Sequence, residues 1–497
     1  MTAGSLEKIQ VGIVGLGRIA DLHAPGYAGS RHARIYAVCD TDADLALKRK
    51  KEWKAARHFT SFEEMLGDPA VDAVEILTPQ KLHEPMAIAA ARAGKHIAIQ
   101  KPMTTDLASA DRMLRSAGGS SAVFRVTDNY LFYPPIVLAK KLIDDGAIGT
   151  PSNMRIKFTG GFGGWDIPAS SWEWRMQERA EGRGIQTFDH GHHLYATAWR
   201  LMGEIERVTA WIDYADGVLD CPAVIMFKNA NRASYGVIEY AQAKDLRIPS
   251  KYYANDEWIE ITGSGGIIMV HRCTGNIHAG PAVSLFNRKK WTRYNVASDW
   301  REGFIGATGN FIDAIMGKTE PLLSGAQGRA LLRFALAVQR SSRRRREVYL
   351  DEMDSPWPWI LSKTRALRDR SSSGDGLLSR RSGGAAYARQ AKQLTEGLPA
   401  RFNAAAAPGW RCVAGLHILA DAGVEESKYC AAIDEKGISL KEGPWPESAA
   451  FVLSAPAGTW AAILLGKKKI ETAFVQGKLK IRGKAEEALK LKASLRL

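Results

Sequence analysis

Short apolar runs alternate with amphipathic segments through about the first 125 residues of the chain. Each apolar run has the length of one buried strand, and the segments between them carry the apolar spacing of helices. The predicted strands cover residues 10–14, 34–40, 72–77, 96–100 and 122–126, and the predicted helices cover residues 45–53, 83–94 and 106–117. Regular alternation of strand and helix predicts right-handed crossovers and a parallel, doubly wound sheet, so this region is expected to be α/β.

From about residue 150 the apolar positions alternate along longer runs. This pattern predicts strands with one covered face in a largely antiparallel sheet. Strands are expected at 152–158, 207–213, 223–227, 233–239 and 258–262, and helices at 135–145, 187–202, 303–317 and 325–339. The second region is therefore expected to be an α+β domain with a large, mostly antiparallel sheet.

Basic and small polar residues interrupt the pattern between residues 340 and 384, where Arg343 to Arg346 form a basic run. This composition is typical of a linker or a partly ordered surface segment. A new unit of about 110 residues follows, which is long enough to build its own small α+β core. The expected parts of the chain are residues 1–125, residues 126–350, a linker at 351–384, and residues 385–497.

Composition narrows the class of protein. The chain has 497 residues, of which 45% are hydrophobic and 24% are charged, as is usual for a globular protein. Its five cysteines are scattered without a C-x-x-C pair, so they suggest neither a disulfide framework nor a zinc site. No apolar run reaches transmembrane length and the first residues lack a signal-peptide pattern, so we expect a cytoplasmic protein.

The formal net charge of +15 is unevenly distributed. Residues 340–382 contribute +5 and residues 383–497 contribute +6, so the first 339 residues carry only +4. Such a basic excess can attract anionic lipid or nucleic acid, or it can be a solvated surface with a basic linker. Because the usual nucleic-acid recognition motifs do not occur, we favour the second interpretation and expect no nucleic-acid partner.

The first predicted strand runs directly into the pattern G-x-G-x-x-A. Its fixed positions are Gly15, Gly17 and Ala20. In this pattern the first glycine allows a tight turn, the second lets a pyrophosphate approach the backbone, and the small third residue lets the helix pack closely. Arg18 and Ile19 lie inside the turn, where amide groups at the helix start favour phosphate. The alternative is a glycine-rich turn without a ligand.

Asp40 ends the second predicted strand, 20 residues after Ala20. A carboxylate at this position accepts hydrogen bonds from ribose hydroxyls and repels a 2′-phosphate. We therefore expect a dinucleotide site that prefers NAD over NADP.

Three further polar groups follow strand ends or open a helix. They are Thr78-Pro79-Gln80 with His83 after the 72–77 strand, Gln100-Lys101-Pro102 at the end of the 96–100 strand, and Asp189-x-Gly191-x-His193 at the start of the 187–202 helix. Open α/β sheets bind ligands at the carboxyl ends of their strands, so the first two groups are placed to contact a cofactor.

In order and spacing, the glycine motif and these three groups resemble the Gfo/Idh/MocA family of oxidoreductases over about residues 8–350. Gln100-Lys101-Pro102 corresponds to the family motif E-K-P, and Asp189-x-Gly191-x-His193 to D-x-G-x-H. The resemblance implies a Rossmann domain joined to an α/β domain whose sheet forms the substrate floor and often the oligomer contact. It also implies that NAD or NADP oxidises or reduces a sugar, cyclitol or related polyol. By the same resemblance, Thr78, Pro79, His83, Gln100 and Lys101 lie near the cofactor.

The chemistry of these residue types agrees with that resemblance. Removing a hydride from a carbinol carbon also requires removing the hydroxyl proton, and His193 has the intrinsic pKa of a general base. Asp189 lies four residues earlier on the same helical face, where it can orient His193 or bind a neighbouring hydroxyl. Lys101 can stabilise the developing alkoxide. A plain turn after the strand is the alternative for the Lys-Pro pair.

Two positions depart from the family pattern. Gln100 replaces the acid of E-K-P, so Lys101 loses one candidate charge partner, and Ala196 stands where the family often has an acid. His190 and His192 add imidazoles close to His193, but no histidine–acid set has convincing ligand spacing, so we expect no metal.

An aromatic and glycine-rich segment is the candidate substrate loop. Trp165 can stack on the apolar face of a sugar, Arg175 can bind a polar group, and Tyr130 follows a strand where it can line the cleft. A tryptophan cluster that packs the loop itself explains the same residues equally well.

The last unit resembles the sterol carrier protein type 2 family. The phrase Gly477-Lys-Leu-Lys-Ile481 precedes a predicted terminal helix at 485–495, and the turn at 434–437 and the step at 464–466 fit the same pattern. The resemblance implies helices over a mostly antiparallel sheet and an apolar tunnel for lipids or acyl chains. A core-filled domain used for dimerisation or docking is the alternative.

Together these observations predict an NAD(P)-dependent dehydrogenase that acts on a secondary hydroxyl of a polyol, sugar or glycoside. We expect a homo-oligomer, with an apolar ligand in the last domain. The alternative from another class is a non-catalytic protein that senses NAD and signals through its C-terminal module. Simple lipid carriage would leave the first 350 residues unexplained.

Overall fold

The computed structural model describes residues 8–119, 121–230, 233–271, 275–278, 280–354 and 383–495. The chain divides into two compact units, residues 1–355 and 356–497, and each is described by itself. Most of the linker expected at 351–384 lies outside the described residues. In the part of the chain that the structure describes, no helix combines the length and the apolarity needed to cross a membrane.

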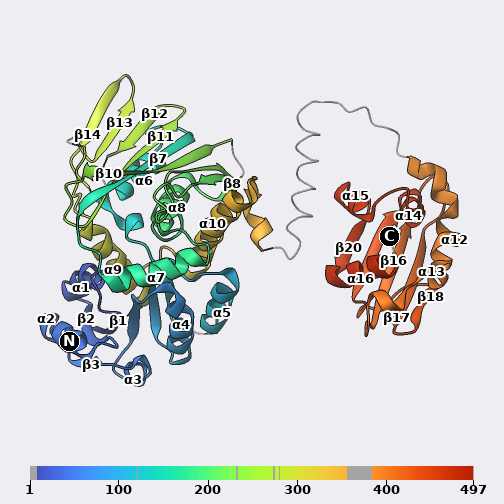
Figure 1. Cartoon of the computed structure of the whole chain (residues 1–497), viewed down its shortest axis with the longest axis horizontal. Coiled ribbons are helices and arrows are strands. Elements are labelled where there is room, and N and C mark those ends of the chain that lie inside the picture. Colours follow the sequence, from blue (N-terminus) through green and yellow to red (C-terminus); the bar gives the residue numbers. More distant parts are fainter. Residues whose placement is uncertain are drawn as a thin grey trace, which may run out of the picture. The chain divides into compact units, whose positions relative to one another are not determined.

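A six-stranded sheet forms the first part of the N-terminal unit, in the order β3-β2-β1-β4-β5-β6 (Figure 1). Every neighbouring pair is parallel, which confirms the predicted doubly wound α/β fold. The elements are β1 (Ile9–Val14), α1 (Ala20–Ala28), β2 (Ala33–Cys39), α2 (Ala43–Glu52), β3 (Arg57–Phe59), α3 (Phe62–Leu66), β4 (Ala73–Ile76), η1 (Gln80–Leu82), α4 (His83–Arg92), β5 (His96–Gln100), α5 (Leu107–Ala117) and β6 (Phe124–Thr127). Because the winding reverses between β1 and β4, the loops after these strands meet at the carboxyl edge.

A nine-stranded sheet forms the rest of this unit, in the order β14-β13-β12-β11-β7-β10-β9-β8-β15. Only the β7–β10 pair is parallel among its described pairings, so the mostly antiparallel sheet is confirmed. Its strands are β7 (Pro151–Gly164), β8 (Ile205–Ile212), β9 (Ala223–Asn229), β10 (Tyr235–Arg247), β11 (Tyr253–Gly263), β12 (Gly266–Val270), β13 (Val283–Asn287), β14 (Lys290–Tyr294) and β15 (Val348–Tyr349).

Helical segments accompany this second sheet. They are η2 (Asn129–Phe132), α6 (Pro134–Asp144), α7 (Ala169–Ala180), η3 (Ile185–His190, a π-helical turn), α8 (Gly191–Met202), α9 (Arg301–Ile315), α10 (Gly325–Arg344) and η4 (Leu350–Met353). Helix α8 packs on β7 and α10 packs on β8. The alternation of β7 explains this packing, since Met154, Ile156 and Phe158 are buried under helices while Arg155 and Lys157 between them are exposed.

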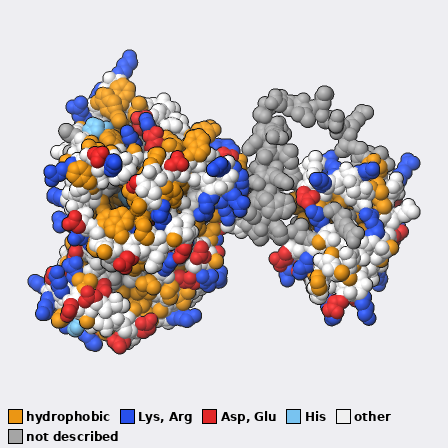
Figure 2. All heavy atoms as spheres, in the orientation of Figure 1, with side chains coloured by type: hydrophobic (Ala, Val, Ile, Leu, Met, Phe, Trp, Pro, Cys, Tyr) orange, Lys and Arg blue, Asp and Glu red, His pale blue; other side chains and the backbone are white. Residues whose placement is uncertain are grey.

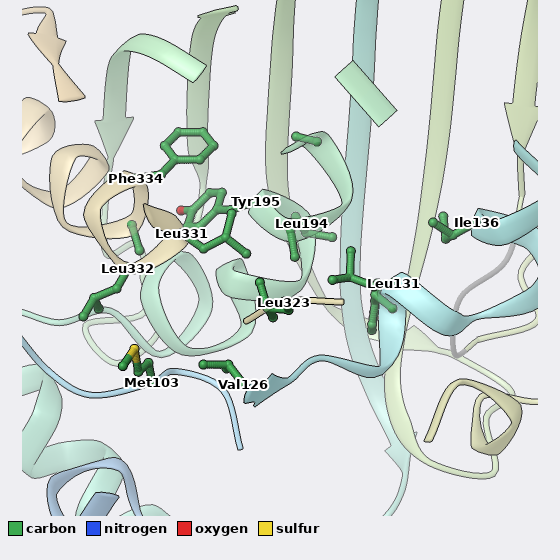
Figure 3. Packing of buried hydrophobic residues seen from close by; sticks show 14 of the residues in the cluster. Met103, Val126, Leu131, Ile136, Leu194, Tyr195, Leu323, Leu331, Leu332 and Phe334 are labelled. Atoms are coloured by element: carbon green, nitrogen blue, oxygen red, sulfur yellow. The ribbon is translucent and has the colours of Figure 1, made fainter. Parts of the chain in front are cut away.

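The helix that carries the candidate histidines is fixed by a dense apolar contact (Figure 3). Leu194 and Tyr195 of α8 lie in one cluster with Leu331, Leu332 and Phe334 of α10. The ring centroids of Tyr195 and Phe334 are 4.7 Å apart. Because these side chains are buried, α8 cannot rotate without breaking the core, and the polar face of its first turn has a fixed direction.

Regular structure in the first unit continues past residue 340, where the basic and small polar composition begins. Helix α10 runs to Arg344, the C-cap Arg345 adopts φ 51°, and β15 then pairs with β8. Arg343 and Arg344 therefore form the solvent-exposed end of a helix whose other face is buried, and Figure 2 shows Lys and Arg side chains gathered there. Arg346 follows the helix and pairs with the buried carboxylate of Glu352 at 2.7 Å. The basic composition of this segment did not indicate that the helix continues, because the apolar positions of α10 end before its last residues.

The C-terminal unit is built on a five-stranded sheet in the order β18-β17-β16-β19-β20, with only β16 and β19 parallel among its described pairs. Its elements are η5 (Gly383–Gln390), α12 (Ala391–Glu396), α13 (Leu398–Arg401), η6 (Ala404–Ala406), β16 (Cys412–Leu419), β17 (Ser427–Asp434), β18 (Gly437–Glu442), β19 (Phe451–Pro456), α14 (Ala457–Leu464), α15 (Ile470–Val475), β20 (Lys480–Gly483) and α16 (Ala485–Leu495). Helices α12 and α13 are separate, because Gly397 lies between them and Pro399 opens the second.

Candidate active site

The glycine turn after β1 has the geometry that its sequence predicts. Gly15 has φ +85°, and a Cβ at this position would lie 2.8 Å from the carbonyl carbon of Leu77 in the loop after β4. A Cβ at Gly17 would meet no heavy atom within 4 Å. Gly15 is therefore required by the backbone, whereas Gly17 leaves the turn open to the close approach that a pyrophosphate needs. Ile19 is the N-cap of α1 and is partly buried.

Asp40 is fixed beside this turn. Its Oδ2 accepts a hydrogen bond from the Leu16 amide at 2.7 Å, and its Oδ1 accepts one from the Asp42 amide at 3.1 Å. Two backbone donors orient the carboxylate while leaving lone pairs on both oxygens. The arrangement fits a ribose with free hydroxyls.

Arg18 reaches from the glycine turn to Trp165 of the candidate substrate loop. Its guanidinium carbon lies 5.1 Å from the ring centroid of Trp165. Tyr252 and Tyr253 contact the same indole edge-on, with centroid distances of 5.3 and 5.6 Å. Trp165 is thus part of an aromatic cluster. These contacts are compatible with both interpretations of the segment, a cluster that packs the loop and a surface that contacts substrate.

The loops after β4 and β5 are joined through His83. Its Nε2 lies 2.8 Å from the Thr78 carbonyl oxygen and its Nδ1 3.0 Å from the Pro102 carbonyl oxygen. Burial lowers the pKa of His83, and the contacts with backbone carbonyl oxygens oppose that shift. The structure places His83 between the two loops, where it supports them from within, while Thr78 and Pro79 belong to the loop itself.

The Gln100 side chain contacts His23 and the backbone of Lys101, and not the Lys101 ammonium. Its Nε2 lies 3.1 Å from His23 Nε2, and its Oε1 accepts a hydrogen bond from the Lys101 amide at 2.8 Å. His23 in turn lies 3.2 Å from the buried carboxylate of Glu75. The glutamine that departs from the family motif thus connects Lys101 to a buried polar group rather than pairing with its charge.

Lys101 forms an ion pair with Asp189. Its Nζ donates to Asp189 Oδ1 at 2.9 Å and to the Asp189 carbonyl oxygen at 2.8 Å. Arg175 Nε lies 3.5 Å from Asp189 Oδ2 on the other side. Burial alone would raise the pKa of Asp189, but the two cations outweigh burial and hold its pKa well below the usual range. Asp189 is therefore ionised and fixes the Lys101 ammonium.

The expectation that Asp189 orients His193 is not met by this geometry. Asp189 lies in the π-helical turn η3 and His193 in the α-helical α8, so the two residues do not follow one regular i,i+4 spacing. His193 Nδ1 instead contacts Asp128 Oδ1 at 2.8 Å. Asp128 directly follows β6, and its position at the carboxyl end of a strand is the signal that could have identified it.

Beneath His193 lies a second carboxylate that sequence reasoning missed. The Tyr130 ring stacks on the His193 ring with centroids 4.3 Å apart and an interplanar angle of 14°. The Tyr130 hydroxyl donates to Glu257 Oε1 at 3.1 Å, and His190 Nε2 lies 3.1 Å from the same oxygen. Tyr130 is only 1% exposed, so it supports His193 rather than forming the cleft wall expected of it. Glu257 lies in β11, and its sequence gave no signal of this role.

Arg175 and His192 are each held by a backbone carbonyl oxygen. Arg175 is held by a hydrogen bond from its Nη1 to the Ser171 carbonyl oxygen at 3.0 Å, and its guanidinium lies over Trp174. His192 is buried, its Nδ1 lies 2.6 Å from the Phe188 carbonyl oxygen, and burial lowers its pKa to about 4. Among the described residues, no group of three or more His, Cys, Asp and Glu side chains is placed to hold a metal ion.

The C-terminal unit contains a pocket of about 530 Å³ between the segment before β16 and helix α16. Its lining includes Trp410 and the charged side chains of Arg411, Lys484, Glu487 and Lys490. The centre of the unit is filled by a separate apolar cluster around Trp460, which is 2% exposed.

Comparison with known proteins agrees with these features. Residues 9–127 match the family model described as "Oxidoreductase family, NAD-binding Rossmann fold", and residues 136–269 match the "GFO/IDH/MocA C-terminal domain". Residues 416–496 match the "SCP-2 sterol transfer family".

The chain is similar to a myo-inositol 2-dehydrogenase of Thermotoga maritima, at 23% identity over 69% of this chain and 99% of the relative. It is also similar to a levoglucosan dehydrogenase of Pseudarthrobacter phenanthrenivorans, at 29% identity over 41% of this chain and 54% of that protein. A solved levoglucosan dehydrogenase in complex with NADH and L-sorbose shares the fold, with a TM-score of 0.60, 21% identity, and coverage of 69% of this chain and 99% of the other.

Proposed function

Since the chain belongs to the Gfo/Idh/MocA family of oxidoreductases and ends in a sterol carrier protein type 2 region, we propose that it transfers a hydride between NAD and a secondary hydroxyl of a sugar, cyclitol or glycoside. It is a dehydrogenase that acts on CH–OH groups, within the class of NAD-dependent sugar and polyol oxidoreductases. The observation that carries the finer proposal is the contact of Lys101 with Asp189 beside a buried, carboxylate-bound His193.

The residues around the glycine turn fit a dinucleotide. Gly15 permits the tight turn, Gly17 leaves the backbone accessible, and Asp40 is oriented for a ribose. Arg18 and Ile19 lie directly before α1. We assign cofactor contacts also to Thr78 and Pro79, in the loop that follows β4, with Gln100 and His83 supporting the neighbouring turns. When bound, NAD accepts the hydride that leaves the substrate carbon. The preference for NAD over NADP is assigned to the negative charge of Asp40.

His193 is the proposed general base. Burial lowers its pKa, although Asp128 opposes that shift, so the imidazole is neutral and can accept a proton at pH 7. Its Nδ1 faces Asp128, which leaves Nε2 as the basic nitrogen. The substrate O–H bond breaks, its proton moves to Nε2, and the carbon–oxygen bond becomes a carbonyl as the carbon loses its hydrogen as hydride.

Lys101 is the proposed electrophilic group. Two of its three ammonium hydrogens go to Asp189, so the third is available to the substrate oxygen. A fixed positive charge there stabilises the oxygen as negative charge develops during proton removal. Asp189 thereby positions Lys101 and, with its remaining lone pairs, can accept a bond from a neighbouring substrate hydroxyl. Trp165 and Arg175 are assigned to the outer part of the substrate.

The remaining partners are proposals of the same kind. The nine-stranded sheet carries exposed apolar side chains at Trp211, Met226, Tyr235 and Trp291, which suits association into a homo-oligomer. The match of residues 416–496 to the SCP-2 sterol transfer family supports an apolar ligand, or an apolar portion of the substrate, for the C-terminal unit. The described cysteines are free, as in a reducing cytoplasm, where we place the protein.

The test is NADH formation by the full-length chain on a panel that pairs free sugars and cyclitols with the same rings carrying apolar groups. We expect turnover of one ring class and its loss in His193→Gln with NAD binding retained. Equal turnover in wild type and His193→Gln would remove His193 from the mechanism. NAD binding without turnover of any hydroxyl compound would favour a sensor.

A further inference from the structure

Asp128 is a buried carboxylate that the family motifs do not include. It is 1% exposed and directly follows β6, whose last residue Thr127 accepts the Lys101 amide through its carbonyl oxygen at 3.2 Å. The pairing of β5 with β6 therefore brings Asp128 to the same end of the sheet as Lys101. Burying a carboxylate is costly unless it is fully hydrogen-bonded, so its partners indicate what it is for.

The two hydrogen-bond partners of Asp128 among the described residues converge on one of its oxygens. Asp128 Oδ1 accepts the Tyr130 amide at 3.0 Å and faces His193 Nδ1 at 2.8 Å. Asp128 is the N-cap of η2, so the local backbone fixes the direction of the carboxylate. A backbone-anchored acceptor at this distance requires a proton on His193 Nδ1, and a neutral imidazole then has its lone pair on Nε2.

The rest of the His193 environment holds the ring in place. Its face stacks on Tyr130, and its backbone belongs to the first turn of α8, where Thr197 bonds the His193 carbonyl oxygen at 2.8 Å. In the described residues, Nε2 of His193 has no hydrogen-bond partner. The ring therefore presents a single unpaired acceptor atom.

We infer that Asp128 is the positioning residue of this dehydrogenase, selecting the His193 tautomer with Nε2 as base and stabilising the imidazolium that forms when the substrate proton arrives. The inference rests on the proposed role of His193 as base. It assigns to Asp128 the orienting role that spacing alone assigned to Asp189, and it leaves Asp189 to fix Lys101.

The charges around His193 set the sign of the pH effect. Lys101 and His190 face it from the β5 end and from η3 and disfavour the imidazolium, whereas Asp128 favours it. Asp189 carries a negative charge on the η3 side, balanced by Lys101 and Arg175, and Glu257 lies beyond Tyr130. Removing only the Asp128 charge must therefore lower the pKa of His193 and weaken it as a base.

Asp128→Asn isolates that charge, because the amide oxygen can still accept from both Tyr130 N and His193 Nδ1. We expect kcat to fall by about 10–100-fold, less than the roughly 10²–10⁴-fold that a general base itself contributes, with little change in NAD affinity. Activity is lost as pH falls through the His193 pKa, so the acidic limb of the kcat–pH profile must move to lower pH. Asp106→Asn is the matched control, since Asp106 likewise accepts a backbone amide at a helix start but has no histidine partner.

Three results overturn the inference or its premise separately. An unshifted acidic limb in Asp128→Asn, with His193→Gln inactive, refutes the role of Asp128 alone. Full activity of His193→Gln refutes the proposed base. Should Asp128→Asn fail to fold, imidazole nitrogen NMR of the wild-type chain decides, with the His193 signals assigned by their loss in His193→Gln: an Nδ1–H tautomer supports the inference, and an Nε2–H tautomer overturns it.

Discussion

The proposed preference for NAD over NADP rests on the charge of Asp40, and Asp40→Asn tests it with little change of shape. The Asp40 carboxylate ends β2 and accepts the Leu16 amide of the glycine turn at 2.7 Å and the Asp42 amide at 3.1 Å. The asparagine keeps one acceptor oxygen and loses the charge. NAD affinity should therefore decrease modestly, because one of the two amides loses its acceptor.

The effect on NADP should be larger and of opposite sign. Two unit charges about 4 Å apart at an effective dielectric constant of about 20 repel each other by about 4 kcal/mol. Asp40 is only partly buried, so water and salt reduce this repulsion to roughly 1–2 kcal/mol. Relieving it corresponds to a gain in the NADP-to-NAD affinity ratio of roughly 5–30-fold.

The assay is titration of NADH and NADPH against wild type and variant at low and high salt. We expect the affinity ratio to change in favour of NADPH, and to change less at high salt, because the repulsion is electrostatic. Asp42→Asn is the control, since it also removes a carboxylate next to β2 but leaves Asp40 in place. An unchanged ratio in Asp40→Asn, or an equal change in Asp42→Asn, would refute the assignment of Asp40 to the ribose.

Three further predictions concern the site, the core and the last unit. Lys101→Met should lower kcat by about 10²–10³-fold with NAD still bound, measured by steady-state kinetics, because the substrate oxygen loses its fixed charge; a change in KM alone would contradict this. Gly26→Ala should lower the free energy of unfolding by about 1–3 kcal/mol in a denaturant titration, because a Cβ there would lie 1.8 Å from the Thr308 hydroxyl oxygen. Gly309→Ala, where a Cβ meets nothing within 4 Å, should be neutral or stabilising, and equal losses in both variants would refute the packing argument. A chain that ends at Arg370 should keep turnover of free polyols but lose its advantage on apolar conjugates if the C-terminal unit shapes the substrate; identical preferences in both chains would make that unit an independent module.

The architecture was predictable because two periodicities dominate the sequence. Alternation of apolar runs with helical spacing defined the parallel sheet, and the period-two runs defined the strands of the large sheet. The glycine turn could also be predicted from the sequence, because Gly15 has a backbone conformation that other residues rarely adopt. Short elements such as β3 and α3 escaped notice, because five or fewer residues carry too little pattern.

The interior of the site was only partly predictable. Lys101 and His193 follow from motif spacing, but their partners come from distant segments, with 88 residues between Lys101 and Asp189 and 65 between Asp128 and His193. The π-helical turn at 185–190 also shifts Asp189 off the regular face of the helix, and nothing in the residue types indicates that shift. Pairing between distant segments and one irregular turn therefore determine that Asp189 contacts Lys101 and that Asp128 contacts His193.

The central claim is that a carbinol carbon of a sugar or polyol gives its hydrogen to NAD while His193 takes the hydroxyl proton. The most direct measurement uses the best substrate of the panel, deuterated at the candidate carbon, in single turnovers of wild type and His193→Gln. The account predicts deuterium in the reduced nicotinamide, a primary isotope effect in wild type, and a large loss of rate in His193→Gln. Reduced cofactor without deuterium, or an unchanged rate in His193→Gln, would contradict it.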